Sequence, residues 1–184
     1  MTKSIFSTFT ILGISATAAF AGPMSSGKGG ATPALNVPAV CDCFEANSLS
    51  FSTYAGGMIS NGGAGNGGES LDDAFAAGIA LDYFFTQNVG LEADATFITT
   101  SSEISLVTGS VVVRAPVKSA CFAPFVLAGG GIHADGVTQG VWHAGGGLDL
   151  RLANCWGIFA DARYTWAEDS DNYTLLRGGV RFSF

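Results

Sequence analysis

Ten charged side chains, placed between apolar neighbours, carry most of the chemistry that this sequence could perform. Five are arginines and five are carboxylic acids, so every guanidinium group can pair with an acid. Such pairs share strong hydrogen bonds and suit a confined polar interior. The set is Asp82, Glu92, Asp94, Arg114, Asp149, Arg151, Asp161, Arg163, Arg177 and Arg181.

The two histidines are the next candidates, because imidazole can bind a metal ion or act as a general base. His133 and His143 could hold a metal ion together with Asp135 or Asp149. A lone histidine in a polar interior or loop is more often simply hydrogen-bonded. We therefore expect no metal, no cofactor and no catalytic residue.

Two glycine triplets, at 129–131 and 145–147, raise the question of phosphate binding. A glycine-rich phosphate loop needs a strand followed by a helix. No helical pattern follows either triplet. Glycine within a strand more often marks tight curvature or the close approach of another backbone, and we expect that role here.

The chain begins with a segment typical of exported proteins. Lys3 is the only charged residue among the first 21, an apolar run starts at Ile5, and residues 19–21 form an A-x-A cleavage site. This pattern predicts a secretory signal peptide over residues 1–21. An uncleaved anchor is the alternative, although the run is short for a spanning helix. Residues 22–47, rich in Gly, Ser, Ala and Pro, are expected to form a flexible periplasmic tether.

The charge balance argues against nucleic acid as a partner. Without the signal peptide, seven Lys and Arg face fifteen Asp and Glu, which leaves a formal charge of −8. Binding to a phosphate backbone needs a basic surface. No apolar run after the signal peptide reaches the roughly 20 residues of a membrane helix, so a helical membrane protein is excluded as well.

Four cysteines after an export signal favour disulfide bonds over a metal site. They are Cys41, Cys43, Cys121 and Cys155, and their spacing matches no zinc motif. Cys41 and Cys43 are too close for an easy bond with each other. The simplest expectation is a bond from Cys121 or Cys155 to the CDC segment. A bond between Cys121 and Cys155 is the alternative.

The stretch WGIFADARYTW, residues 156–166, shows the pattern that positions the charged side chains. Apolar residues occupy every second position, and Asp161 and Arg163 lie between them. A period of two is the signature of a β-strand with two different faces. Eight segments fit this pattern, near 48–58, 73–85, 89–97, 107–115, 122–133, 140–152, 156–166 and 173–184.

The connections between these segments alternate in length. TQN, PVKSAC and ANC are short, whereas ISNGGAGNGGES, TTSSE, ADGVTQ and AEDSDN are longer and more polar. Short turns at one end and longer loops at the other predict an all-β fold, an eight-stranded antiparallel up-and-down transmembrane barrel over residues 48–184. Neighbouring strands then bring Asp161 opposite Arg177 or Arg181.

Aromatic residues indicate which face of the strands looks outward. They lie toward the ends of the apolar face and comprise Tyr83, Phe85, Trp142, Trp156, Tyr164 and Trp166. Aromatic girdles at both edges of an apolar band mark the two interfaces of a membrane barrel. The apolar face should therefore contact lipid, and the charged face should line a lumen. An arginine on lipid near the midplane would cost about 2–4 kcal/mol, which supports this orientation.

The end of the chain, LLRGGVRFSF, carries the most specific resemblance. Its alternating apolar residues Leu176, Val180, Phe182 and Phe184 resemble the C-terminal signal by which small outer-membrane barrels are recognised for insertion. APFVLAGGGIHA and HAGGGLDLRL are similar to adjacent strands of such barrels. Over residues 48–184 the chain resembles the eight-stranded barrels of Gram-negative bacteria, the OmpA-type and opacity-protein-like porin family. The CDC segment departs from that pattern.

The resemblance implies an outer-membrane location with a periplasmic N-terminus, insertion by the barrel-assembly machinery, and contact with outer-membrane lipids and lipopolysaccharide. All four cysteines would then lie at the periplasmic rim. Some barrels of this kind are lipid A hydrolases with His and Ser close together on a strand, but neither His here has a Ser two residues away. The longer loops would form an acidic outer rim of Glu69, Asp72, Asp73, Glu103, Asp135, Glu168, Asp169 and Asp171.

Three functions fit these expectations. We expect a structural or surface protein whose lumen is plugged by ion pairs, because eight strands enclose a space that side chains can just fill. Arg114 should then face Glu92 or Asp94 on the adjacent strand. The alternatives are a small porin-like channel and an adhesin or recognition protein that acts through its loops.

Overall fold

The computed structural model describes residues 44–61, 73–99, 103–134, 138–153, 155–167 and 171–184. All of them belong to one compact unit, residues 37–184. The predicted signal peptide and most of the predicted tether therefore lie outside the described residues. No helix among the described residues is long and apolar enough to cross a membrane.

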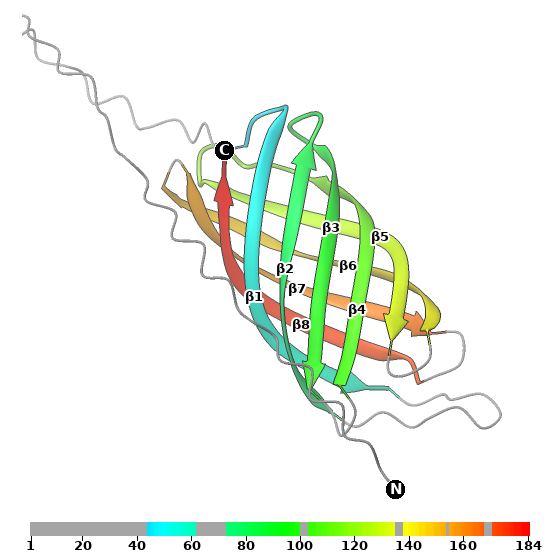
Figure 1. The fold of residues 1–184 in the computed structure, drawn as a ribbon. Helices are drawn as coiled ribbons and strands as arrows, with labels where there is room; N and C mark the ends of the chain where they lie inside the picture. Colours follow the sequence, from blue (N-terminus) through cyan, green and yellow to red (C-terminus); the bar gives the residue numbers. More distant parts are fainter. Residues whose placement is uncertain (1–43, 62–72, 100–102, 135–137, 154, 168–170) are drawn as a thin grey trace, which may run out of the picture. The chain divides into compact units, whose positions relative to one another are not determined.

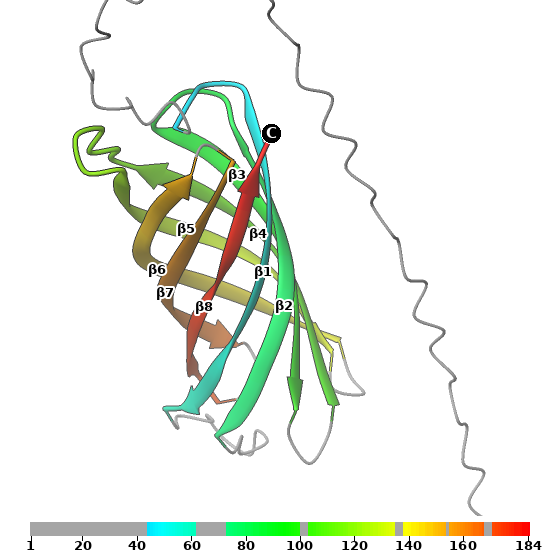
Figure 2. The same ribbon diagram turned by 90° about the vertical axis from the view of Figure 1, so that its left-hand side faces the viewer.

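Eight antiparallel strands form a closed barrel in chain order, and the last strand pairs back onto the first (Figures 1 and 2). Closure removes the strand edges, whose unpaired backbone groups lipid could not satisfy. The predicted eight-stranded up-and-down architecture is confirmed. The strands are β1 (Ser48–Ser60), β2 (Ala74–Phe84), β3 (Val89–Thr99), β4 (Glu103–Arg114), β5 (Phe122–Ala134), β6 (Thr138–Ala153), β7 (Trp156–Ala167) and β8 (Tyr173–Ser183).

The strands alternate between two faces, as their period of two predicts. In β3, Glu92 and Asp94 are buried, whereas Phe97 on the other face is 63% exposed. Trp142 on β6 is 65% exposed, and Asp82 on β2 is 0% exposed. Charges inside and large apolar side chains outside reverse the arrangement of a soluble protein. This arrangement suits a barrel whose surroundings are apolar.

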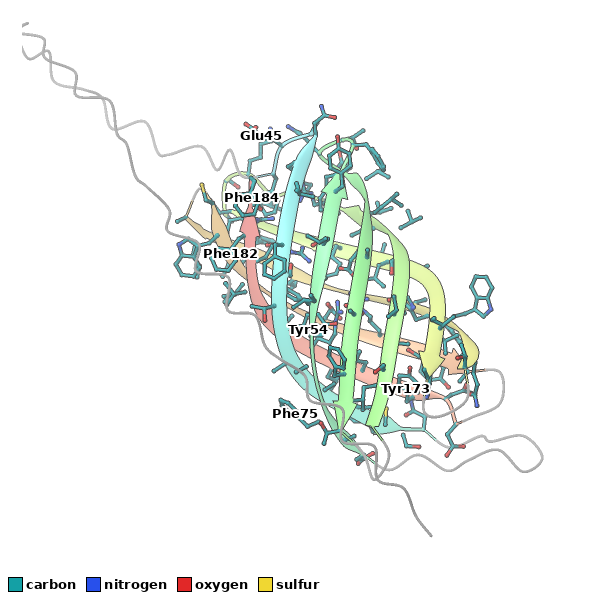
Figure 3. All side chains as sticks on the ribbon, in the orientation of Figure 1. Glu45, Tyr54, Phe75, Tyr173, Phe182 and Phe184 are labelled. Atoms are coloured by element: carbon teal, nitrogen blue, oxygen red, sulfur yellow. The ribbon has the colours of Figure 1, made fainter. Side chains whose placement is uncertain are left out.

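The two ends of the barrel differ in what they carry. We call the end where β1 begins and β8 ends the terminal rim, and the opposite end the loop rim. Figure 3 shows Glu45 and Phe184 at the terminal rim and Phe75 and Tyr173 at the loop rim. The connections at the terminal rim are 85–88, 115–121 and 154–155, and those at the loop rim are 61–73, 100–102, 135–137 and 168–172.

Two of the connections predicted to be long are short, so that part of the prediction is wrong. Strand β3 runs to Thr99 and β4 starts at Glu103, which leaves only residues 100–102 between them. In the same way, residues 135–137 alone separate β5 from β6. The polar residues at these strand ends still pair with the neighbouring strand. The backbone hydrogen bonds between paired strands form even where the side chains point into water.

The interior consists of three layers. Toward the loop rim lies a buried apolar cluster of Met58, Ala76, Ile98, Tyr173 and Leu175. Toward the terminal rim lies a second one, made of Phe84, Val112, Phe125 and Leu127. The charged side chains occupy the space between them. The middle of the lumen also holds a third apolar cluster, Tyr54, Ala80 and Phe159. Inward positions near the strand ends carry both apolar residues and polar ones such as Ser48 and Arg114.

Candidate functional site: the charged interior and the rims

All ten charged side chains expected in the lumen point into the barrel and are buried. Their exposed fractions run from 0% at Asp82 to 6% at Asp161. Five different strands contribute a carboxylate or guanidinium group to one connected set of ion pairs, from β2 and β3 on one wall to β6, β7 and β8 on the other. The alternating face of each strand places these groups inside, and the strand register decides which of them meet.

Arg177 is at the centre of this network. Its Nη2 lies 2.8 Å from Asp161 Oδ2, and its Nε donates to Asp161 Oδ1 at 3.0 Å. The two residues are directly opposite each other on β7 and β8, and Arg177 is one of the two partners expected for Asp161. Its Nη1 donates to Asp94 Oδ2, and its Nη2 is 3.7 Å from Glu92 Oε1. One guanidinium group thus joins acids from opposite walls.

Two acids on neighbouring strands need more than one cation. Asp82 and Glu92 are directly opposite each other on β2 and β3, a placement in which two carboxylates repel. Arginines from the far wall relieve this repulsion. Arg163 Nη2 lies 2.5 Å from Glu92 Oε1, and Arg181 Nη2 lies 3.3 Å from Asp82 Oδ2 and 3.8 Å from Glu92 Oε2.

Asp149 is shared by two arginines nearer the terminal rim. Arg181 Nη1 is 2.9 Å from Asp149 Oδ2, and Arg151 Nη2 is 3.1 Å from the same oxygen. Arg181 Nε also donates to Ser52 Oγ at 2.9 Å, and Arg151 Nη1 donates to Ser183 Oγ. These contacts tie β6 to β1 and β8 through the interior of the barrel.

Arg114 does not face Glu92 or Asp94, so the pairing expected for it is wrong. Both acids lie opposite residues near the middle of β4, whereas Arg114 ends β4 at the terminal rim. There its Nε donates to Gln87 O at 2.8 Å, and its Cζ lies 3.4 Å from the centre of the Phe84 ring. Alternation assigns a residue to a face, but it does not give the residue's height along the barrel.

Sequence reasoning missed Tyr54, which belongs to the same network. Its hydroxyl donates to Asp94 Oδ2 at 2.5 Å and lies 2.7 Å from Thr96 Oγ1. Arg177 Cζ is 4.3 Å from the centre of the Tyr54 ring. Gly78, opposite Tyr54 on β2, provides the space, since a Cβ at Gly78 would overlap the tyrosine hydroxyl. A glycine paired with an inward aromatic residue is the signal that could have identified it.

A hydrogen bond of 2.7 Å joins Ser110 Oγ to His143 Nε2. Gly129 on β5 lies between them in the register, and a Cβ there would overlap the backbone of β4. Serine and histidine at this distance resemble a nucleophile and its base. Both are only 4% exposed inside the barrel, and their hydrogen bond joins β4 to β6 across Gly129. His133 is buried near Tyr173, with ring centroids 6.3 Å apart.

The described residues contain no group of three or more His, Cys, Asp or Glu side chains that could hold a metal ion. Asp135, considered above as a partner for the histidines, lies outside the described residues. Asp149, the other acid considered, is engaged by Arg151 and Arg181. The charged interior therefore supports ion pairing better than metal coordination.

The aromatic residues expected at the membrane interfaces lie at both rims. At the terminal rim Tyr83 and Phe85 pack edge to face, with ring centroids 5.1 Å apart. Near the loop rim Tyr164 and Trp166 do the same at 4.8 Å. Trp156 belongs to the terminal group, since it begins β7, and Trp142 lies opposite Trp166 in the loop group. The apolar band between the two groups faces outward.

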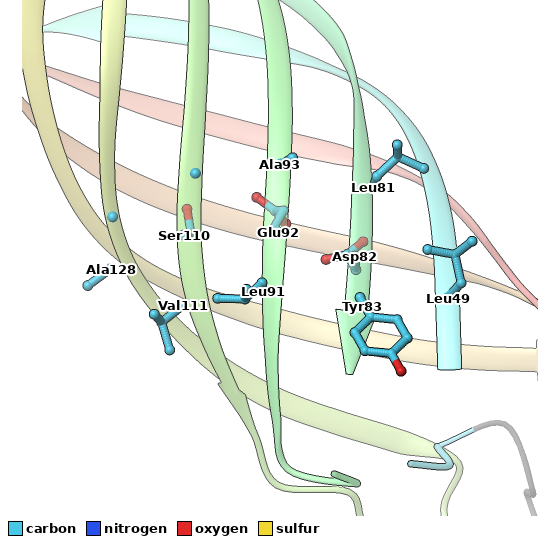
Figure 4. Close-up of a pocket in the computed structure, with 12 residues that line it drawn as sticks. Leu49, Leu81, Asp82, Tyr83, Leu91, Glu92, Ala93, Ser110, Val111 and Ala128 are labelled. Atoms are coloured by element: carbon cyan, nitrogen blue, oxygen red, sulfur yellow. The ribbon is translucent and has the colours of Figure 1, made fainter. Parts of the chain in front are cut away.

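The outer face is hollowed on the side of β1 to β5 (Figure 4). The hollow measures about 450 Å³, and its outward lining is mostly apolar. Asp82, Glu92 and Ser110 border it through their backbone, because their side chains are buried on the inner face. The Tyr83 hydroxyl is the polar group of this lining, and alone it offers little to orient a ligand. It is lined mainly by Leu49, Leu81, Tyr83, Leu91, Ala93, Gly109, Val111 and Ala128.

The residues expected to form the insertion signal lie on the outer face of β8 and, in the case of Phe184, directly after it. Leu176 is 43% exposed, Phe182 41% and Phe184 81%, and Val180 is partly exposed between them. The Phe184 N–H donates to Leu49 O at 2.8 Å, so pairing with β1 continues to the end of the chain. These side chains therefore lie beside the seam where the barrel closes.

Two of the four cysteines lie among the described residues, and both are at the terminal rim. Arg151 N donates to Cys121 O at 2.8 Å, and Ser183 N donates to Cys155 O at 2.9 Å. Cys155 is free and exposed, so the alternative bond between Cys121 and Cys155 is wrong. Cys121 is not a free cysteine. Cys41 and Cys43 lie outside the described residues, so a bond from Cys121 to the CDC segment stays a prediction.

The acidic outer rim is described only in part. Asp73 is exposed, and its Oδ1 accepts a hydrogen bond of 3.0 Å from Ser60 N. Asp171 is only 4% exposed, so its assignment to an exposed rim is wrong. It lies two residues before β8, which begins at Tyr173. Five of the other acids, together with the Glu103 side chain, lie outside the described part of the structure; the five are Glu69, Asp72, Asp135, Glu168 and Asp169.

Comparisons with known proteins agree with this geometry. The N-terminal β-barrel domain of OprF from Pseudomonas aeruginosa superimposes with a TM-score of 0.60 at 16% identity, over 76% of this chain and 98% of that one. Neisserial surface protein A (NspA) superimposes with a TM-score of 0.59 at 15% identity, over 76% of this chain and 98% of that one. Ail, the attachment invasion locus protein of Yersinia pestis, superimposes with a TM-score of 0.52 at 16% identity, over 76% of this chain and 99% of that one.

At these identities the three solved structures show a shared fold and nothing finer. No curated protein sequence matches the chain. A family model, the outer membrane protein beta-barrel domain, matches residues 31–184 and thus covers all eight strands. The closed barrel, its outward apolar band and this match lead to one conclusion: the chain belongs to the outer membrane protein β-barrel domain family.

Proposed function

We propose that this protein is a non-conducting and non-catalytic barrel that serves the outer membrane as a structural or surface protein. The observation that carries the proposal is the filled interior, in which an ion-paired layer lies between two buried apolar clusters. An eight-stranded barrel is narrow enough for side chains to fill it. Water and ions would have to pass both clusters to cross the membrane.

A porin-like channel is the runner-up, and the same side chains argue against it. Met58 and Tyr173 are 1% and 0% exposed on the loop side, and Phe84 is 1% exposed on the terminal side. Between them, Arg177 is bound to acids from opposite walls. A permeating ion would have to displace these contacts, which costs energy because each partner would be left buried and unpaired.

Single-channel recording in planar lipid bilayers tests the proposal. The refolded protein should give no stable open level, and a steady conductance of nanosiemens order would refute a sealed interior. Met58→Ala combined with Phe84→Ala truncates one side chain in each cluster and should admit ions in brief openings. Phe97→Ala, on the outer face, is the matched control and should stay silent.

We also propose that the loop rim faces the cell exterior and contacts lipopolysaccharide. The proposal rests on family membership and on the sequence of the loop-rim connections, where 61–73 and 168–172 contain several acids but no Lys or Arg. Acids of this kind can bridge to lipid phosphates through divalent cations. Lipopolysaccharide that co-purifies with the barrel should fall on chelation and in a variant with Asp72→Asn and Asp169→Asn. Unchanged lipopolysaccharide in both experiments would refute the bridging.

The orientation itself can be tested with the free thiol of Cys155. If the terminal rim is periplasmic, a membrane-impermeant thiol reagent added to intact cells should leave Cys155 unlabelled, and the same reagent should label it in broken cells. Labelling from outside would reverse the orientation. A recognition role remains the third possibility, and it would have to rest mainly on the long connection 61–73.

A further inference from the structure

The chain directly before β1 turns back into the mouth of the barrel at the terminal rim. Asn47 has a φ of 55°, a left-handed conformation that asparagine tolerates better than most residues. Ser48 Oγ donates to Glu45 O at 3.0 Å and closes the turn. The turn brings Phe44 under the barrel, where its side chain is only 1% exposed. A phenylalanine that precedes the first strand is therefore one of the most buried residues of the protein.

Two arginines hold Phe44 in this position. Arg114 Cζ lies 5.1 Å from the centre of the Phe44 ring, and Arg151 Cζ lies 5.0 Å from it. Arg114 also stacks on Phe84 at 3.4 Å, so its guanidinium group lies between two aromatic rings. Its Nη2 donates to Glu45 O at 3.2 Å, the same carbonyl oxygen that Ser48 binds. Cation–π contacts and a charged hydrogen bond thus converge on one short segment.

Arg114 differs from the other interior arginines in its partners. Arg151, Arg163, Arg177 and Arg181 each contact at least one carboxylate. Within the described residues Arg114 contacts none, and its Nη1 has no hydrogen-bond partner. A buried cation without an acid is costly unless other groups stabilise it. The groups that do so here are the Phe44 and Phe84 rings and the carbonyl oxygens of Gln87 and Glu45.

We propose that residues 44–47 form a plug that closes the terminal rim and can withdraw while the barrel stays folded. The plug precedes β1, so its departure breaks no strand pairing. It costs the contacts of Phe44 and Glu45 and the 3.4 Å hydrogen bond that the Tyr83 hydroxyl donates to Asn47 Oδ1. Withdrawal opens a vestibule lined by Arg114, Arg151 and Phe84. The apolar cluster at the loop rim stays in place, so the vestibule is open at one end and the barrel does not become a channel.

The sequence gives this plug an attachment point. Cys43 immediately precedes Phe44, and Cys121 lies at the same rim, where its carbonyl oxygen accepts a hydrogen bond from Arg151. The expected bond from Cys121 to the CDC segment would hold the plug in the mouth. Loss of that bond should therefore raise the fraction of open plug without affecting the loop rim.

Site-resolved thiol labelling measures the opening. Val112→Cys places a thiol in the apolar cluster behind the plug, and Leu175→Cys places one in the cluster at the loop rim. Both are made in a Cys155→Ser background, and a small water-soluble maleimide is located by peptide mass mapping. Phe44→Ala should speed labelling at residue 112 by about tenfold or more, and labelling at residue 175 should not change.

Further variants separate the plug from a general loosening of the barrel. Phe51→Ala removes an outer-face phenylalanine from β1 and should leave both labelling rates unchanged. Phe44→Trp keeps an aromatic face and should stay slow, whereas Phe44→Leu and Cys121→Ser should give intermediate rates. If Phe44→Ala prevents folding, Phe44→Leu carries the test.

Two results would overturn the proposal. One is an unchanged rate at residue 112 in a folded Phe44 variant, since the plug would then not limit access. The other is an equal acceleration at residue 175, which would indicate that the whole barrel has loosened. Neither result bears on the sealed interior of the intact protein, which bilayer recording tests separately.

Discussion

Replacing Arg177 by methionine should destabilise this barrel more than any other single arginine substitution. The Arg177 side chain is fully buried and contacts Asp94, Asp161 and Glu92. Methionine fills much of the same volume but carries no charge, so the three acids lose a shared cation. Arg163 and Arg181 still reach Glu92, whereas Asp94 loses the one arginine that contacts it among the described residues.

The size of the expected loss of stability follows from the partners that remain for each acid. Removing one member of a buried ion pair typically costs about 3–5 kcal/mol, because the other charge is left uncompensated. Arg177→Met should therefore lower the free energy of unfolding by about 3–5 kcal/mol. Arg114→Met is the matched comparison. It removes a buried cation that contacts no described carboxylate, so we expect a loss of only about 1–2 kcal/mol from its ring and carbonyl contacts.

A double variant isolates the uncompensated charge. Asp94→Asn in the Arg177→Met background removes one of the acids that the first substitution leaves unpaired. The double variant should regain about 1–3 kcal/mol relative to Arg177→Met alone. The asparagine keeps the shape of the aspartate and can still accept the hydrogen bond from Tyr54.

Reversible urea unfolding in lipid vesicles is a suitable assay. Trp142, Trp156 and Trp166 lie on the outer face and report the loss of membrane contact by fluorescence. The slope of the unfolding free energy against urea concentration should be the same in every variant. A shift in the unfolding midpoint then reports a change in stability. Equal losses for Arg177→Met and Arg114→Met, or no recovery in the double variant, would refute the reasoning from ion pairs.

Three further predictions concern the outer face, the backbone packing and the cysteines. Ala93→Arg, at mid-strand on the lipid face, should cost about 2–4 kcal/mol in the same unfolding assay, whereas Thr99→Arg at the strand end should cost about 0–1 kcal/mol. Gly129→Ala should separate β4 from β5 and lower stability by at least ~1 kcal/mol, since its Cβ has no free space; wild-type stability would contradict this. Peptide mapping of the non-reduced protein should link Cys121 to the CDC segment, and an unlinked Cys121 would exclude that bond.

Much of the fold could be predicted because the barrel repeats one simple pattern. In β7, apolar residues such as Trp156 and Ile158 alternate with Asp161 and Arg163. This alternation predicts both the strand and which of its faces points outward. The pair Asp161 and Arg177 was also accessible, since both lie near the middle of consecutive strands. Local periodicity is sufficient wherever a residue's environment depends only on its face.

The contacts that could not be predicted depend on how far along the barrel axis each residue lies, which periodicity does not encode. Arg114 shares an inward face with the acids of β3, but the register sets it at the rim. The contact between Ser110 and His143 requires two registers and the missing side chain of Gly129. Phe44 belongs to no strand at all, and its burial follows from the turn at Asn47. The first two cases need a strand register, and the burial of Phe44 also needs its contacts with Arg114 and Arg151, which are far away in the sequence.

The order of the three interior layers has a physical reason. At mid-membrane the alternative environment for an apolar side chain is lipid, which is as apolar as the protein interior, so burial there contributes little. Ion pairs and hydrogen bonds then hold opposite walls together, and polar side chains cannot leave toward lipid. Near the rims the alternative is water, and the hydrophobic effect favours inward clusters such as those of Met58 and Phe84. Most of the charged side chains therefore lie in the middle and two apolar clusters lie toward the ends. Arg114 and Arg151 are charged groups at the terminal rim, where the Phe44 and Phe84 rings cover them.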